Sequence, residues 1–170
     1  DISAKADLER FFITIYFFYA SRPELSQSFW SDKESNLYGF IEWAAKCNDT
    51  LMRSCFYLMV SSLSYGYSNS QNVFHYIEHG QYISWQTMAH NVSETTEKIA
   101  QLEKKLQELQ QNGAASSVMM TTAVQSGLSE ETVILLSSYF TLIQSVAYEV
   151  DEQTKLKIAD CFYDTFFKFL

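Results

Sequence analysis

The residues with the clearest chemical potential are His75, Glu78 and His79, which form the pattern His-Tyr-Ile-Glu-His, or H-x-x-E-H. This spacing is the one found in the inverted zincin metallohydrolases. On a helix, His75 and His79 share one face, as two zinc ligands must, and Glu78 lies beside them as a candidate general base. The pattern therefore raises the hypothesis of a zinc hydrolase that uses His75 and His79.

The surrounding sequence weighs against a metal. The helix that carries the motif is short and ends at Gly80, and the remaining histidine, His90, lies at the start of the next helix. No downstream glutamate stands out as a third ligand. The alternative interpretation is a pair of surface histidines that flank a helix end. On this basis we predict no metal site, no cofactor and no catalytic residue.

Other enzyme classes lack their sequence signatures here. No serine, cysteine or aspartate stands in a recognisable nucleophile context, and the five glycines are isolated rather than grouped in a phosphate-binding loop. Cys47, Cys55 and Cys161 show no C-x-x-C spacing, and an odd number of cysteines on apolar faces indicates free, buried thiols in a reducing compartment. We therefore predict a protein that is not an enzyme and has no small-molecule substrate.

The composition excludes several further classes. Hydrophobic residues make up 47% and aromatic residues 16% of the 170-residue chain, which rules out a disordered protein. The formal net charge of −8 argues against direct binding to nucleic acid and against docking on an anionic membrane, since both need a basic surface. The longest apolar run, Phe11–Ala20, is too short to span a bilayer. A single proline suits helices joined by short turns.

The element that organises the rest is a long helix predicted over residues 84–112. Ser84 can serve as its N-cap, and Gly113 stands at its expected end. At 1.5 Å per residue the helix reaches about 40 Å, which is longer than a compact domain needs, so we expect it to protrude. Residues 113–127, small and mostly polar, are predicted to form a flexible loop that closes the protrusion.

Apolar residues on this helix recur every three or four positions and form one stripe. Its members in the second half of the helix are Ile99, Leu102, Leu106 and Leu109. The stripe either packs against neighbouring helices of the same protein or is a docking face for a partner helix. It is shorter than the three to four heptads that are typical of a dedicated coiled coil.

The rest of the chain is also predicted to be helical. Pairs of helices with the size of two-helix solenoid units are expected over residues 35–46 and 49–64, and over residues 129–148 and 151–169. The apolar end, Phe166–Leu170, would normally be covered by following residues. We therefore predict that residues 1–170 are a single segment of a larger, irregular all-α solenoid of HEAT- or armadillo-like helix pairs. A closed helical bundle is the alternative.

Two local features refine this prediction. Ser21 is expected to cap a short helix that has Pro23 in its first turn. Gly39, inside the predicted third helix, costs about 1 kcal/mol relative to alanine, and a close contact between helices would explain its presence.

The stretch from Phe11 to Trp43 resembles a known family. The residues that carry the resemblance are Arg22-Pro23-Glu24-Leu25, then Phe29-Trp30, then Asn36-Leu37-Tyr38-Gly39-Phe40, and Trp43. They are similar to the largest scaffold nucleoporins of the inner ring of the nuclear pore, the 192/205-kilodalton class. Ser84-Trp85 at the start of a long helix, and the helix over residues 129–150, also fit the layout of that family.

The resemblance implies a large, curved α-solenoid of HEAT- and armadillo-like helix pairs, with a long, tower-like helix projecting from its middle part. It implies a structural protein of the nuclear pore complex in the nuclear envelope, without enzymatic activity, that supports transport of protein and mRNA. Its implied partners are other nucleoporins, bound through short linear segments. No partner-binding residue of the family can be placed on this chain. A soluble HEAT-type transport receptor is the alternative, since it shares the helical content, the acidic charge and the reduced thiols.

Overall fold

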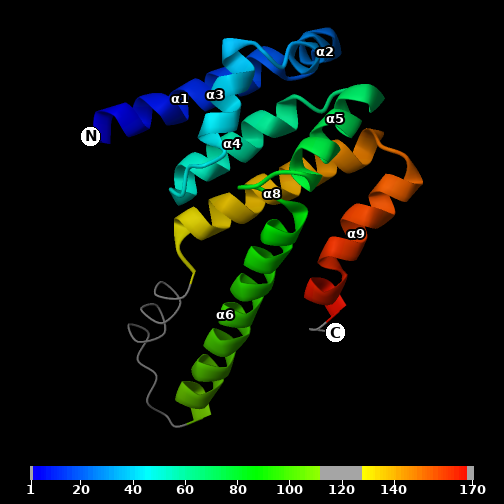
Figure 1. Ribbon diagram of the computed structural model, residues 1–170. Coiled ribbons are helices and arrows are strands. Elements are labelled where there is room, and N and C mark those ends of the chain that lie inside the picture. The colour runs from blue at the N-terminus through cyan, green and yellow to red at the C-terminus, as the bar shows by residue number, and fades with distance from the viewer. Residues whose placement is uncertain (1, 112–127, 168–170) are drawn as a thin grey trace.

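The computed structural model describes residues 2–111 and 128–167, and these residues form helices joined by short turns (Figure 1). The helices within these two ranges are α1 Ile2–Tyr19, α2 Pro23–Ser31, α3 Asn36–Ala44, α4 Thr50–Ser62, α5 Tyr67–Glu78, α6 Trp85–Gln111, α8 Glu130–Glu149 and α9 Glu152–Phe167. The described residues contain no strand, in agreement with the predicted all-α class. None of their helices is long and apolar enough to cross a membrane. The loop predicted over residues 113–127 lies outside the described residues.

Short polar side chains define where many of the helices begin. In each case a hydroxyl or carboxylate oxygen accepts a hydrogen bond from the backbone N–H three residues later, which the helix itself leaves without a partner. The capping residues are Ser35 for α3, Asp49 for α4, Ser84 for α6, Ser129 for α8 and Asp151 for α9. The predicted start of the long helix at Ser84 is therefore confirmed.

Helix α4 is the centre of the fold. It packs against α1 on one side and against α8 on the other (Figure 1), so its side chains are buried on nearly all faces. Tyr57 meets Tyr139 of α8 edge to face, with the ring centroids 4.8 Å apart. Phe56 makes the same kind of contact with Phe12 of α1 at 5.9 Å. The core thus joins three layers of helix through aromatic contacts. Helix α4 packs chiefly on α1 and α8 rather than on the helix over residues 36–44, its predicted pair, whereas the predicted pair α8 and α9 is in contact.

Helix α6 has an anchored part and an exposed part. At its start, Trp85 and Val92 are buried, and Asn91 Nδ2 donates a hydrogen bond of 2.8 Å to the hydroxyl of Tyr139. Helix α9 lies beside this first part (Figure 1). From Ile99 onward the described side chains are half-buried or exposed. The helix has 27 residues, close to the predicted length. Its protrusion from a parent solenoid stays a prediction.

Two local predictions are wrong. Ser21 does not cap α2, because its backbone takes a left-handed φ of 60°, and Arg22 occupies the N-cap position without a side-chain hydrogen bond. Gly39 is not in a close contact, because a Cβ atom built there would meet nothing within 4 Å. The tight glycine is Gly80, where a Cβ would lie 2.2 Å from the carbonyl oxygen of Ile83. The chain bends there between α5 and α6.

The cysteines are free, as predicted, but they are half-buried rather than fully buried. Burial raises the pKa of the Cys55 thiol and the pKa of the Cys161 thiol. Both therefore stay protonated near neutral pH, and neither has the lowered pKa of a reactive cysteine.

Candidate functional site

Helix α5 presents the H-x-x-E-H motif on its outer face. The helix rests on α2 and α8. Phe74 and Ile77 point into the core and are almost fully buried, as apolar residues at helical spacing should be. His75 and His79 lie on the outer face of the same turns and are exposed, and Glu78, beside them, is half-buried.

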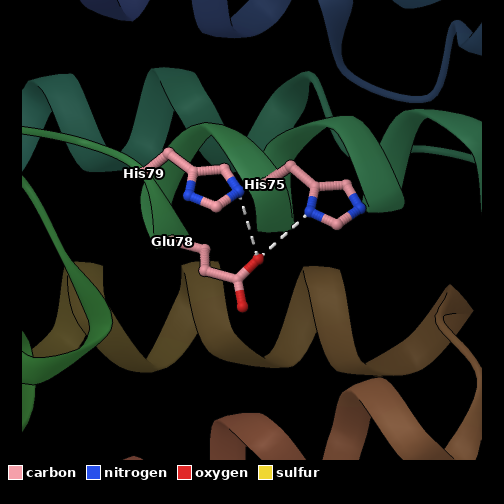
Figure 2. Close-up of side chains that lie close together, drawn as sticks. All are labelled: His75, Glu78 and His79. Carbon is pink, nitrogen blue, oxygen red and sulfur yellow. Dashed lines mark hydrogen bonds and ion pairs between the residues drawn. The ribbon is translucent and has the colours of Figure 1, made fainter.

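The three side chains converge on one another (Figure 2). Glu78 Oε2 lies 3.2 Å from His75 Nδ1 and 3.6 Å from His79 Nε2. One ligand atom from each residue lies within 4.8 Å of those from the other two. The imidazole rings are nearly parallel, with 4° between their planes and 6.1 Å between their centroids. The helix thus brings together the residues that the motif spacing places on one face.

This arrangement differs from the layout of a zinc hydrolase. In that hypothesis His75 and His79 hold the metal, and Glu78 remains outside the coordination sphere as general base. Here Glu78 lies between the two rings, at distances typical of a third ligand. The side chains of His75, Glu78 and His79 are 56%, 31% and 76% exposed. No further histidine, cysteine, aspartate or glutamate of the described residues joins the group.

A pocket of about 390 Å³ lies beside the motif, between α2, α3, α5 and the turn that follows α5. Trp30, Tyr38 and Tyr76 form an aromatic wall. The two histidines of the motif also line the pocket, whereas Glu78 does not. Burial raises the pKa of Tyr76, so its hydroxyl stays neutral at physiological pH. Sequence reasoning missed this pocket because its walls come from separate segments whose contact no local pattern predicts.

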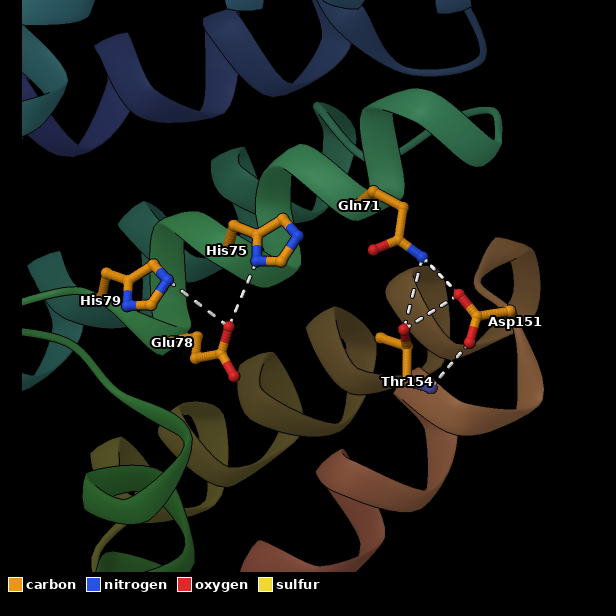
Figure 3. Close-up of polar contacts among 6 residues, drawn as sticks. All are labelled: Gln71, His75, Glu78, His79, Asp151 and Thr154. Carbon is orange, nitrogen blue, oxygen red and sulfur yellow. Dashed lines mark hydrogen bonds and ion pairs between the residues drawn. The ribbon is translucent and has the colours of Figure 1, made fainter.

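A second polar cluster ties α5 to α9 (Figure 3). Gln71 Nε2 donates a hydrogen bond of 2.7 Å to Asp151 Oδ2. Asp151 also accepts hydrogen bonds from the backbone N–H and the hydroxyl of Thr154, at 2.9 and 3.0 Å. The Thr154 N–H holds the pKa of the Asp151 carboxyl below its usual value. This cluster caps α9 and attaches it to α5, which accounts for its acidic residue without catalysis.

The candidate docking stripe follows the second half of α6. Ile99, Leu102, Leu106 and Leu109 are each half-buried, and their spacing places them on one face of the helix. The lysines and glutamates between them are exposed. The four residues therefore form a narrow apolar face that is bordered by charged side chains.

Comparison with known proteins assigns the chain to a family. The family model of nuclear pore complex scaffold nucleoporins 186/192/205 matches residues 1–170. Nucleoporin NUP192 of Chaetomium thermophilum is 45% identical over 58 residues, which are 34% of this chain and 3% of that protein, so the match spans a small part of this relative. Because the family match covers all 170 residues, the chain belongs to the nuclear pore complex scaffold nucleoporins 186/192/205, the family that its residues resemble.

Proposed function

We propose that this chain is a segment of the structural scaffold in the inner ring of the nuclear pore complex, where it binds other nucleoporins and supports nucleocytoplasmic transport. The observation that carries the proposal is the family match over residues 1–170. The architecture supports it, because packed helix pairs are the units from which α-solenoid scaffolds are built. The proposed role is non-enzymatic, since the family is one of scaffold proteins.

Exposed aromatic side chains support a role in assembly. Phe17 and Phe18 on α1 are 68% and 52% exposed. Apolar surface of this kind is characteristic of contacts with other protein surface. In a solenoid, such faces are covered by adjacent helices of the same protein or by partner chains.

The stripe on α6 has the properties of a docking face for a helix of another nucleoporin. Its residues Ile99, Leu102, Leu106 and Leu109 follow the spacing with which an apolar helix face meets a partner helix. The exposed charges beside them would set the register of the pair. Packing of the stripe on a neighbouring helix of the same parent protein is the second arrangement that would bury it.

Imaging of the tagged full-length parent protein in living cells tests the scaffold role. We expect a punctate rim at the nuclear envelope that persists through a division cycle. A diffuse signal that shuttles between nucleus and cytoplasm would instead favour a HEAT-type transport receptor and contradict the proposal.

Cross-linking of the full-length protein tests the stripe. Lys104 and Lys105 are exposed beside it, so they should cross-link to another nucleoporin. The double variant Leu102→Ser/Leu106→Ser should lose those cross-links, while the conservative control Glu103→Gln on the same helix keeps them. Cross-links confined to the parent chain would assign the stripe to internal packing.

A further inference from the structure

The cluster on α5 has a chemical capacity that the scaffold role does not use. We propose that His75, Glu78 and His79 form a surface site for a divalent transition-metal ion of the zinc type. The sequence predicts no metal here because no third ligand stands out downstream, but the structure brings Glu78 itself into the position of the third ligand. The proposal is independent of the scaffold role, since it rests on three side chains within one helical turn.

The distances in the cluster fit such an ion. In a tetrahedral site with bonds of about 2.0–2.1 Å, neighbouring ligand atoms lie about 3.3 Å apart. Glu78 Oε2 lies 3.2 Å from the nitrogen of His75 and 3.6 Å from that of His79, and all the ligand atoms fall within 4.8 Å of one another. Both imidazole rings are exposed, so rotation about their side-chain bonds can bring the ligand atoms from within 4.8 Å of one another to the shorter separation of a metal site. Binding therefore needs no movement of the backbone.

The ligand types select the class of ion. Imidazole nitrogen suits zinc, copper and nickel, and a carboxylate adds a negative charge to the set. Magnesium and calcium prefer oxygen ligands, so a site with two imidazoles disfavours them. Three protein ligands leave a fourth position for water. The ion would replace the contact between His75 Nδ1 and Glu78 Oε2.

The location of the cluster indicates what the ion would do. His79 is the C-cap of α5, and its backbone N–H donates a hydrogen bond of 3.1 Å to the carbonyl oxygen of His75. Gly80, the next residue, starts the tight bend towards α6. An ion that joins His75 to His79 stabilises the last turn of α5 beside this bend. With Glu78 bound as a ligand, no carboxylate of the cluster remains to act as general base, so we assign the ion the role of holding the end of α5.

Calorimetric titration of the folded, reduced chain with zinc chloride tests the proposal at neutral pH, where unprotonated imidazole binds metal. We expect one ion per chain. Loss of a supporting partner alone weakens metal sites by about tenfold or more, so His75→Gln and His79→Gln should each weaken binding by more than tenfold. The matched control is His90→Gln, because His90 pairs with Glu94 at 3.8 Å on α6, outside the cluster, and should leave the affinity unchanged.

A second set of measurements separates this site from a cysteine site. Burial, followed by the charges of Asp160 and Glu78, raises the pKa of Cys161, so this thiol is the competing ligand to test. Cys161 is not among the residues whose ligand atoms group together, so the variant Cys161→Ser should keep its zinc affinity. In NMR spectra, paramagnetic Co²⁺ should shift the imidazole signals of His75 and His79 before that of His90.

Thermal unfolding gives a further readout, because an ion that binds the folded chain raises its Tm. Zinc chloride should raise the Tm of the unaltered chain and leave that of the double variant His75→Gln/His79→Gln unchanged. Equal zinc affinity of the double variant and the unaltered chain would overturn the proposal and leave a hydrogen-bonded surface cluster. Loss of binding in Cys161→Ser alone would also overturn it.

Discussion

Helices α4 and α6 use their apolar residues in different ways. In α4, most side chains are buried, because α1 covers one side and α8 the other. In α6, burial declines along the helix, from Trp85, which is almost completely buried, to Leu106, which is half-buried. Leu63, directly after α4, is fully buried. Leu63 and Leu106 thus differ in exposure although both are leucines, and the helices packed around α4 account for the difference.

The serines of α4 show what complete burial requires. Ser54, Ser61 and Ser62 are buried, and each hydroxyl donates a hydrogen bond to a carbonyl oxygen of its own helix, at 2.8, 2.6 and 2.6 Å. A buried donor without a partner costs about 1–3 kcal/mol, so these bonds make polar residues acceptable at helix contacts. The charged residues in the second half of α6 face solvent and need no such arrangement.

The largest expected effect tests the burial difference directly. Phe56→Ala in α4 should lower the free energy of unfolding by about 3–5 kcal/mol, because it leaves a cavity between α1 and α4. The truncation Leu106→Ala on the stripe of α6 should cost about 1 kcal/mol, since only part of that side chain is buried. Urea denaturation followed by circular dichroism measures both. Equal losses would contradict the distinction between the two helices.

The next effect concerns the bend that leads into α6. Gly80→Ala should lower the free energy of unfolding by about 2 kcal/mol, because the added Cβ would meet the carbonyl oxygen of Ile83 at 2.2 Å and force the backbone to shift. Thermal unfolding would record this as a lower Tm. A variant as stable as the unaltered chain would show that the backbone of the bend between α5 and α6 can shift at little cost, unlike the packed region around α4.

The caps of the two helices should differ in their response to pH. Asp49→Ala and Ser84→Ala each remove an N-cap, of α4 and α6 respectively, and each should cost about 1 kcal/mol. Only the first depends on a titrating group. A hydrogen bond from Lys5, at 2.6 Å, and then the Met52 N–H lower the pKa of the Asp49 carboxyl.

The sign of this pH effect follows from the lowered pKa. The contribution of Asp49 is fully present above its unfolded-state pKa of about 4, and it is lost as the pH falls through the lower folded-state value. Denaturant unfolding should therefore show that the chain loses stability as the pH falls from neutral to acidic. The variant Ser84→Ala should show the same loss, and Asp49→Asn should show a smaller one. Asparagine keeps the cap but not the ion pair with Lys5. If Asp49→Asn and the unaltered chain had the same pH profile, the Asp49 carboxylate would be excluded as the source of the pH dependence.

The smallest expected effect has the opposite sign. Gly39→Ala should raise the free energy of unfolding by about 0.5–1 kcal/mol, because alanine loses less backbone entropy in a helix and its Cβ would meet nothing within 4 Å. No other element among the described residues packs against this position of α3, whereas α1 and α8 cover α4. Urea denaturation would detect the gain, and a loss of stability would indicate a contact on that face.

Features that depend on neighbouring residues in the sequence were predictable. The caps Asp49, Ser84 and Asp151 each act on a backbone N–H three residues away. The histidines and glutamate of α5 lie within one turn, so helix geometry alone brings them together. The family resemblance likewise rested on nearby residues, and the match over the whole chain confirms it.

Features that depend on distant partners were harder to predict. The apolar spacing of α8 predicts that Phe140 faces inward, but this side chain is 45% exposed, because the helices around α8 leave that position uncovered. The pocket beside α5 joins Trp30 of α2 to Tyr76 of α5, and no local pattern predicts that pairing. A glycine such as Gly39 signals a close contact only when another element approaches it, which the sequence does not specify.

The burial of Trp85 at the base of α6 also has an optical consequence. Trp85 stacks on Phe74 with ring centroids 5.9 Å apart, and Trp30 is likewise buried, whereas Trp43 is 57% exposed. The intrinsic fluorescence of the chain therefore combines shielded and solvated indoles. An aqueous quencher such as acrylamide should extinguish the emission of Trp43 first, and the light that remains then reports on the core and on the point where α6 joins it, without any attached dye.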